Sequence, residues 1–295
     1  MLGLKLSLHT AFLSLLAVNS AQAYRWFNWQ FDMTCEATGY FVPANESELV
    51  QFVKYHHPRK TMIKPVGNGH GFGNLTTCIS AGEVEGRESY VLSLTNLNSI
   101  EIHDDYTVTF GSGWDLVDLI PELHKNGLQT QNLGSEMVQN FVGAATTGTH
   151  GTGKQHGNIG STILGARILD AKGEIHEYTK DDEDMLKAYR VAIGSLGIIT
   201  ELTIQAEPLS YLKRTTKVLE TPTNITELYV TIQEYADKYE QVNIFGPNLD
   251  WDYNKKTLVP KTNVTLMYFE ETNYTAVQNC STDYCSNECG RCHRN

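Results

Sequence analysis

The sequence has little positive charge and, after its first residues, no long apolar run. It has 23 lysines and arginines against 34 aspartates and glutamates, which gives a net charge of −11. No basic cluster offsets this balance, so a nucleic-acid partner is not expected. No segment after residue 23 is apolar enough to cross a membrane. Internal repeats and low-complexity tracts are also lacking.

Residues 1–23 have the composition of a secretory signal peptide. One lysine precedes the apolar stretch LSLHTAFLSLLAV, and Ala21-Gln22-Ala23 supplies a small-residue cleavage site. A short membrane anchor is the alternative, but the apolar stretch is shorter than the roughly 20 residues that a span needs. The sequence therefore predicts cleavage after Ala23 and a secreted, extracellular protein.

Sequences of the type N-x-S/T support this prediction, because they are acceptors for N-glycosylation when they lie on the surface. One of them, at Asn74, directly follows a glycine-rich loop and is expected to remain unmodified. The glycosylation candidates are Asn45, Asn224, Asn263, Asn273 and Asn279.

Cysteine is scarce through most of the chain, with none between Cys78 and Cys280. Four of the six cysteines lie in a cysteine-rich tail, residues 280–295, whose spacing fits no standard zinc motif. No metal site is therefore predicted. Disulfide bonds in an oxidising compartment and an unstructured tail both remain open for this segment, and the pairing is not fixed.

Helical and extended patterns alternate from Ala37 to Glu207. Residues 46–57 have helical periodicity after Asn45, a suitable N-cap, and residues 61–66 form an apolar strand pattern. Residues 161–179 are typical of a hairpin around Lys172-Gly173. From Leu209 a further helix and strands indicate the start of a second unit. The predicted fold class is α+β.

Two segments are rich in glycine: residues 65–75, PVGNGHGFGNL, and residues 132–160. Neither matches the Walker phosphate loop or the dinucleotide fingerprint G-x-G-x-x-G. Glycine amides can nevertheless approach an anion closely, so both segments predict contacts with a large anionic ligand. A phosphate loop alone does not explain the imidazole of His70 at the centre of the first segment.

Three motifs occur in a fixed order: V-G-N-G-H at 66–70, T-G-T-H-G-T-G at 147–153 and G-S-L-G-I-I at 194–199. This order resembles the FAD-binding domain of the vanillyl-alcohol oxidase (PCMH) type. It is most similar to the sugar-lactone oxidases for gulonolactone and arabinonolactone, and to the alditol oxidases. The resemblance covers about Trp26 to Pro208. It implies a two-subdomain FAD-binding domain at 26–208 and a partial substrate (cap) domain at 209–279.

The resemblance also implies roles for particular residues. His70 occupies the position of the histidine whose ring is bonded to the 8α-methyl group of FAD; the alternative is a histidine hydrogen-bonded within a turn. This family usually has serine after that histidine, whereas this chain has Gly71. The other residues that the resemblance assigns to FAD binding are Val66, Gly67, Asn68, Gly69, Gly71, Phe72, Gly134, Ser135, Asn140, Gly143, Thr147, Gly148, Thr149, His150, Gly151, Thr152, Gly153 and Ile198.

The implied reaction is oxidation of a CH–OH group of a sugar-1,4-lactone or polyol by hydride transfer to the flavin. Oxygen is the expected electron acceptor and would yield hydrogen peroxide. The family's substrate-side E-x-R pair and H-W-G-K-like motif are not found, so no catalytic residue is identified and the base is expected in a C-terminal part that this chain lacks.

Two alternatives follow from this difference. A shortened chain could bind FAD without catalysis, or the chain could belong to the berberine-bridge or cytokinin dehydrogenase branch. Enzymes of the berberine-bridge type often add a cysteine to the flavin linkage. The lack of cysteine between Cys78 and Cys280 excludes such a second bond from the 147–153 segment.

Overall fold

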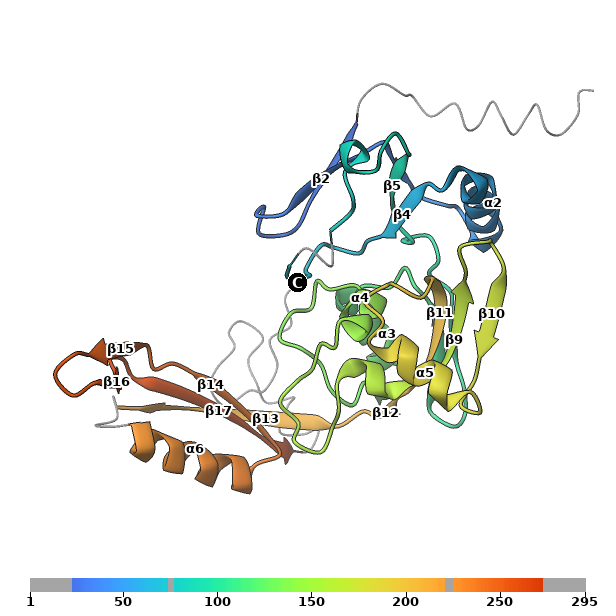
Figure 1. The fold of residues 1–295 in the computed structure, drawn as a ribbon. Helices are drawn as coiled ribbons and strands as arrows, with labels where there is room; N and C mark the ends of the chain where they lie inside the picture. Colours follow the sequence, from blue (N-terminus) through green and yellow to red (C-terminus); the bar gives the residue numbers. More distant parts are fainter. Residues whose placement is uncertain (1–22, 74–76, 221–224, 273–295) are drawn as a thin grey trace, which may run out of the picture.

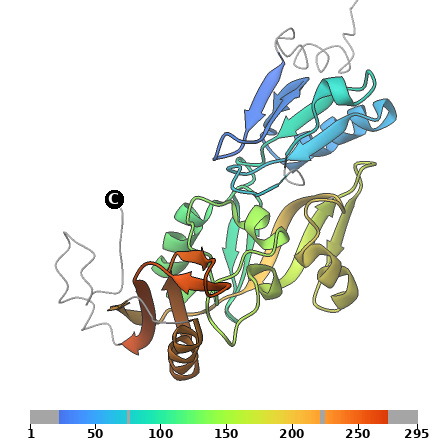
Figure 2. The same ribbon diagram turned by 60° about the vertical axis from the view of Figure 1, so that its left-hand side comes forward.

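The computed structural model describes residues 23–73, 77–220 and 225–272. The predicted signal peptide up to Gln22 and the cysteine-rich tail lie outside these residues. Within them, three main sheets follow one another along the molecule, each formed by a separate stretch of the chain (Figures 1 and 2). No helix in these ranges has the length and apolar character that a membrane crossing requires.

The N-terminal part combines an antiparallel hairpin with a small parallel sheet. The hairpin pairs β1 (Tyr24–Phe27) with β2 (Thr34–Ala37), and the sheet has the order β3 (Gly39–Phe41), β5 (Ser89–Leu92), β4 (Met62–Pro65). Helix α2 (Glu46–His56) begins as the sequence predicts, with the Asn45 side chain accepting a hydrogen bond from the Glu48 amide at 3.0 Å. The described residues of this part also include the 3₁₀ turns η1 (His57–Arg59) and η3 (Ala81–Glu83).

The central part is a five-stranded antiparallel sheet with helices on one face (Figure 1). Its strand order is β10 (Ile175–Tyr178), β9 (Ile163–Leu169), β11 (Ile198–Gln205), β7 (Thr107–Gly111), β6 (Ile100–Ile102). Buried residues alternate along β7 and β11, as expected when one face covers a core. The helices are α3 (Leu116–Lys125), α4 (Phe141–Thr146) and α5 (Glu183–Arg190), with η4 (Ile159–Thr162) and the short pair β8 (Leu128–Gln129) and β12 (Glu207–Pro208) beside them.

This sheet and these three helices enclose the largest core of the molecule. Phe110 of β7 and Phe141 of α4 meet edge to face at its centre, with ring centroids 5.0 Å apart. A second apolar cluster joins Leu49 and Val53 of α2 to Leu169 and Ile198. Helix α2 therefore joins the N-terminal part to the central sheet, where β9 ends and β11 begins.

The C-terminal part is smaller and less well buried. Strands β13 (Tyr211–Leu219), β17 (Val264–Thr272) and β14 (Gln241–Phe245) form its sheet, and α6 (Ile225–Lys238) covers one face (Figure 1). A hairpin of β15 (Leu249–Asp252) and β16 (Thr257–Pro260) extends from it. The core consists of Leu228, Val264 and Leu266 with partly buried neighbours.

Two differences from the sequence patterns have physical explanations. The glycine-rich segment 132–160 has no clear helical period in the sequence, yet it contains α4 and the start of η4. The buried residues Ala144 and Ala145 of α4 are small and give only a weak periodic signal. Pro121 lies inside α3 without ending it, because Leu119, Ile120 and Leu123 bury one face of that helix. Tertiary packing outweighs the local cost of proline here.

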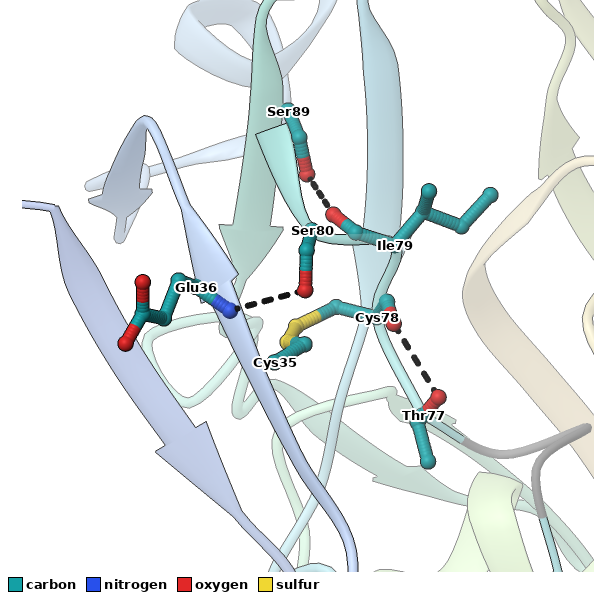
Figure 3. The surroundings of a disulfide bond; sticks show 7 residues. All are labelled: Cys35, Glu36, Thr77, Cys78, Ile79, Ser80 and Ser89. Carbon is teal, nitrogen blue, oxygen red and sulfur yellow. Dashed lines mark hydrogen bonds between the residues drawn. A yellow bond between two sulfur atoms is a disulfide. The ribbon is translucent and has the colours of Figure 1, made fainter. Parts of the chain in front are cut away.

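A disulfide joins Cys35 of β2 to Cys78, a pairing that the sequence leaves open. Their Cα atoms are 5.8 Å apart, within the range that a disulfide requires. Figure 3 shows that this bond fixes the hairpin against the segment that leads from the glycine-rich loop to β5. Beside it the Glu36 amide donates a hydrogen bond to the Ser80 hydroxyl at 3.2 Å, and Ser89 donates to the carbonyl of Ile79.

Candidate functional site

A cavity of about 450 Å³ lies where the parallel sheet meets the central sheet. Strands β4 and β5 both end at this cavity: Pro65 is the last residue of β4 and leads into the glycine-rich loop, and Ser93 follows β5. The region beyond the carboxyl ends of parallel strands is the common ligand site in α/β sheets. The opposite wall comes from the end of β7, from α4, and from the segment between α5 and β11.

The glycine-rich loop lies along one wall, with Val66 to Gly71 lining the cavity. Gly67 is necessary for this position, since a Cβ atom there would lie 2.5 Å from the Cβ atom of Asn140. The Asn68 side chain donates hydrogen bonds to Asp115 at 2.8 Å and to the carbonyl of Val138 at 2.7 Å. The loop is therefore pressed against the central part and tied to it.

Asn140 holds the opposite wall together. Its side-chain nitrogen donates to the carbonyls of Ser112 at 2.8 Å and Trp114 at 3.0 Å, and its oxygen accepts from the Gly143 amide at 3.2 Å. These bonds join the end of β7 to the first turn of α4. Asn140 lines the cavity, as the resemblance implies. The polar atoms of its side chain, however, form hydrogen bonds with main-chain groups of the wall itself.

A tight crossing after β7 completes this wall. Cβ atoms at Gly111 or Gly113 would lie 2.2 Å from the Leu97 carbonyl oxygen or 2.6 Å from the Thr95 carbonyl oxygen, respectively. Only glycine permits this approach of β7 to the turn after β5. The two sheets meet at the cavity through this contact.

The second glycine-rich segment leaves the cavity after Thr147. Gly148 has a φ of +74°, and the chain then folds back on residues 132–134. A Cβ atom on Gly151 would lie 1.9 Å from the Asn132 side-chain oxygen and 2.4 Å from the Leu133 carbonyl oxygen. These glycines therefore allow the segment to pack on itself.

Beyond Gly153 the same segment contacts the C-terminal part. The Lys154 ammonium donates to the carbonyls of Ala236 at 3.1 Å and Asp237 at 3.2 Å, at the end of α6. Its amide donates to the carbonyl of Glu240, and Gly153 forms an isolated bridge with Gln241. The segment thus connects the cavity wall to the C-terminal sheet.

The residues assigned by resemblance divide into two sets. Ile198 packs in the α2 cluster, while its neighbours Gly197 and Ile199 line the cavity. The assigned residues at the cavity are Val66, Gly67, Asn68, Gly69, His70, Gly71, Asn140, Gly143 and Thr147. Those outside its lining are Phe72, Gly134, Ser135, Gly148, Thr149, His150, Gly151, Thr152, Gly153 and Ile198.

Charge and aromatic rings favour a large anionic ligand. Burial lowers the pKa of Lys64, which lines the cavity, and a phosphate group beside it would offset that cost. Tyr24 and Tyr40 line the same region with stacked rings, their centroids 4.7 Å apart. Burial and then Tyr40 raise the pKa of Tyr24, so it remains a neutral hydroxyl at pH 7.

Several residues that line the cavity were not identified from the sequence. Gln139 is one further example: it lines the cavity, and its buried Oε1 atom has no hydrogen-bond partner within the described residues. A donor on a bound molecule would satisfy such an atom. Ser93 directly follows β5 and Ser112 directly follows β7, with Thr95 and Gly113 close behind; a polar residue just after a strand was the available signal.

Comparison with known families identifies the class of this domain. Residues 37–179 match the family described as FAD binding domain. This match makes residues 37–179 similar to an FAD-binding domain, in agreement with the resemblance drawn from the motifs and with the α+β fold class. Glycines at close approaches, the half-buried Lys64 and aromatic side chains in the cavity lining fit this cofactor.

Its curated relatives include enzymes named for sugar lactones. It is 30% identical to L-gulono-1,4-lactone dehydrogenase of Mycobacterium tuberculosis, over 64% of this chain and 42% of the relative. It is 30% identical to D-arabinono-1,4-lactone oxidase of Kluyveromyces lactis, over 75% of this chain and 42% of the relative. L-gulonolactone oxidase of Scyliorhinus torazame is 28% identical over 85% of this chain and 52% of its own. The chain thus spans about half the length of these relatives or less.

Solved structures share the fold at low sequence identity. Cholesterol oxidase of B. sterolicum superposes with a TM-score of 0.71 and 18% identity, covering 90% of this chain and 50% of its own. Alkyldihydroxyacetonephosphate synthase superposes with a TM-score of 0.64 and 14% identity, covering 80% of this chain and 47% of its own. These similarities show the fold. The reaction has to be argued from the residues of the site.

Proposed function

We propose that this chain is the FAD-binding part of an oxidoreductase that oxidises a CH–OH group of a sugar-1,4-lactone or a polyol. The observation that carries the proposal is His70, held in a glycine-rich loop at a cavity of an FAD-binding domain. The names of the relatives supply the substrate class. Oxygen is the proposed electron acceptor, with hydrogen peroxide as its product.

The chain's own residues would bind and fix the cofactor. Main-chain amides of the loop from Gly67 to Gly71 are donors for phosphate oxygens, and Lys64 supplies positive charge. Bound FAD supplies the hydride-accepting chemistry, and the protein supplies orientation and electrostatics. Ser93 and Thr95 offer hydroxyl groups from the second parallel strand end.

His70 is proposed as the point of covalent attachment. A ring nitrogen of His70 would form a C–N bond to the 8α-carbon of FAD, replacing one C–H bond of the methyl group. The methyl proton, the imidazole N–H proton and two electrons leave together, and oxygen takes them up as hydrogen peroxide. Histidine suits this role because a neutral ring nitrogen is a nucleophile.

Acid precipitation tests the cofactor and its link. The chain is expressed in a secretory host, denatured in acid, and examined for flavin absorbance that stays with the polypeptide. His70→Ala should leave only flavin that acid releases. His150→Ala is the matched control, since His150 is exposed outside the cavity lining and its ring meets the carbonyl of Gly151. Retained flavin in His70→Ala, or a folded wild-type protein without flavin, would contradict the proposal.

Anaerobic mixing tests the reaction separately. L-gulono-1,4-lactone, D-arabinono-1,4-lactone and a polyol are each added to the flavin-loaded chain, and bleaching of the flavin spectrum is followed. Bleaching, and hydrogen peroxide formation after oxygen is admitted, support the oxidase. Flavin that binds but is not bleached by any of them would instead favour an FAD-binding chain without catalysis, which lacks the substrate-side residues.

Secretion and glycosylation form a further part of the proposal. The Cys35–Cys78 disulfide suits an oxidising compartment. Asn45 and Asn263 are exposed, whereas Asn224, Asn273 and Asn279 lie outside the described residues. Secreted protein should lose mass when treated with an N-glycosidase and should begin at Tyr24. An unprocessed N-terminus without glycans would contradict this part alone.

A further inference from the structure

The β1–β2 hairpin places an aromatic ring against His70. The Trp29 indole and the His70 imidazole are nearly parallel, at 5°, with ring centroids 5.3 Å apart. This is an offset stack at a distance where aromatic rings attract. Phe72 contacts Trp29 edge-on, with ring planes at 89° and centroids 6.1 Å apart. Trp29 therefore contacts both the predicted attachment residue and a second aromatic ring from the same loop.

Main-chain and side-chain contacts fix Trp29 relative to the loop. The Trp29 amide donates to the carbonyl of Gly69 at 3.1 Å, directly before His70. Gly69 has a φ of +69°, and a Cβ atom there would lie 3.3 Å from the Cα atom of Asn28. Asn28 is buried and donates to Asp32 at 2.7 Å across the hairpin turn. This turn is thus closed on itself and seated on the loop.

The disulfide holds the same hairpin from its other end. Cys35 pairs with Trp26 in the hairpin register and is bonded to Cys78, which follows the glycine-rich loop in sequence. The hairpin is therefore joined to the loop region on both sides of His70, through Gly69 and through Cys78. The position of Trp29 relative to His70 is therefore fixed by a main-chain hydrogen bond and by a disulfide bond.

Stacking leaves the reactive edge of the imidazole open. Within the described residues, no hydrogen bond or ion pair orients the His70 ring, and the contact with Trp29 covers its face. Both ring nitrogens lie in the ring plane, so a partner on the face leaves their lone pairs and protons accessible. A hydrogen bond would fix the ring equally well but would occupy a nitrogen.

We infer that Trp29 is a positioning residue for flavin attachment: it holds the His70 ring so that one nitrogen faces the 8α-carbon. This inference rests on the proposed function, because it presumes covalent attachment at His70. The chemistry is the attachment step described under Proposed function: a C–N bond replaces a C–H bond of the 8α-methyl group, and oxygen takes up the two protons and two electrons that are released. Trp29 exchanges neither protons nor electrons and acts through the orientation of His70.

The rate of attachment tests this role. Chains produced under riboflavin limitation are mixed with FAD in air, samples are quenched in acid, and flavin remaining on the polypeptide is measured against time. Wild type is compared with Trp29→Leu, which removes the stacking face, and Trp29→Phe, which keeps an aromatic face. Phe27→Leu is the control, because Phe27 lies on the same hairpin and contacts Phe31. Reversible FAD affinity is measured on each variant in a His70→Ala background.

Trp29→Leu should attach flavin about tenfold more slowly, because misorientation of a reacting group costs rate. Its reversible affinity should stay within about threefold of the parent, a change worth less than 1 kcal/mol. Trp29→Phe should recover most of the rate, and Phe27→Leu should match wild type. A purely structural role would lower affinity and rate together and would not be rescued by phenylalanine.

The remaining outcomes separate the two proposals. Covalent flavin in wild type with an unchanged rate in Trp29→Leu overturns the positioning role and leaves His70 in place. No covalent flavin in wild type overturns attachment at His70, and the role of Trp29 with it. Circular dichroism checks the fold, and if Trp29→Leu does not fold, Trp29→Met, which also lacks a ring, is measured in its place against the same expectations.

Discussion

The two glycine-rich segments have similar compositions and different tasks. Residues 66–71 lie along the cavity, whereas the second segment reaches it only with residues near α4 and turns away at Gly148. Gly67 permits an approach to Asn140 in the cavity wall, and Gly151 permits an approach to Asn132 and the Leu133 carbonyl inside its own fold. Glycine content thus predicts a close approach but does not say which group is approached.

The largest effects should come from adding a methyl group at each glycine. Neither Gly67 nor Gly151 has a left-handed φ, so alanine tests space alone. Gly151→Ala should lower the free energy of unfolding by about 3 kcal/mol, because main-chain and side-chain oxygens must move. Gly67→Ala should cost about 1–3 kcal/mol and should also weaken reversible FAD binding by at least about tenfold, since it displaces the wall.

Thermal unfolding and flavin titration together separate these two variants. Folded Gly151→Ala should bind FAD with the affinity of the parent, despite its lower melting temperature. Equal loss of FAD affinity in both variants would show that the second segment contacts the cofactor as directly as the first. The comparison would then fail, and the assignment by resemblance would hold for residues such as Thr149 and Gly151.

The local parts of this arrangement were predictable, and the long-range parts were not. The Asn45 cap, the β4 pattern and the Lys172-Gly173 turn depend on neighbouring residues, and each is present in the structure. By contrast, β1 and β2 are only four residues each, too short for a distinctive sequence pattern. The Cys35–Cys78 pair depends on where that hairpin packs, which sequence patterns do not specify.

The site shows the same division. The V-G-N-G-H motif locates His70 at the cavity because the loop that carries it is short and contiguous in sequence. Trp29 approaches His70 through a hydrogen bond to Gly69, across 40 positions of sequence that no local pattern links. In the sequence, Lys64 is an ordinary residue of an apolar strand pattern. Only the position of β4 in the structure shows that Lys64 lines the cavity, where its charge can contact an anionic ligand.

Substitution of two lysines tests the same comparison with smaller expected effects, because Lys64 directly precedes the first glycine-rich segment and Lys154 lies within the second. Lys64 lines the cavity, and Lys154 binds the last carbonyls of α6. Lys64→Met should weaken reversible FAD binding about tenfold through loss of a charge near the phosphates. Lys154→Met should leave FAD affinity unchanged and lower the free energy of unfolding by about 1 kcal/mol or less, since the contact is exposed.

Titration with FAD and urea denaturation measure these two effects independently. A loss of FAD affinity in Lys154→Met would mean that the C-terminal part contributes to the cofactor site through this segment. Unchanged affinity in Lys64→Met would place the phosphates elsewhere in the cavity.

The smallest effect concerns the joint between the N-terminal and central parts, which keeps the two cavity walls together. Glu46 of α2 accepts hydrogen bonds from Arg167 at 2.8 Å and Thr200 at 2.6 Å, on β9 and β11. Burial alone would raise the pKa of Glu46, but these bonds and the Arg167 charge lower it. A carboxyl group with a lower pKa in the folded state stabilises the fold above its unfolded pKa, and this contribution is lost as pH falls through the folded pKa.

Urea denaturation across acidic pH should therefore show a loss of stability as the pH falls below the usual glutamate range. Glu46→Gln should remove about 1 kcal/mol at neutral pH, a modest value because the pair is partly exposed to solvent. It should also flatten the acid limb of the stability curve, since the glutamine does not titrate. Glu48→Gln is a control on the same helix, although Glu48 accepts a bond from the Ala44 amide at 2.6 Å. If Glu46→Gln keeps the full acid limb, other carboxylates cause it, and the joint rests on the apolar contacts of Leu49 and Val53 alone.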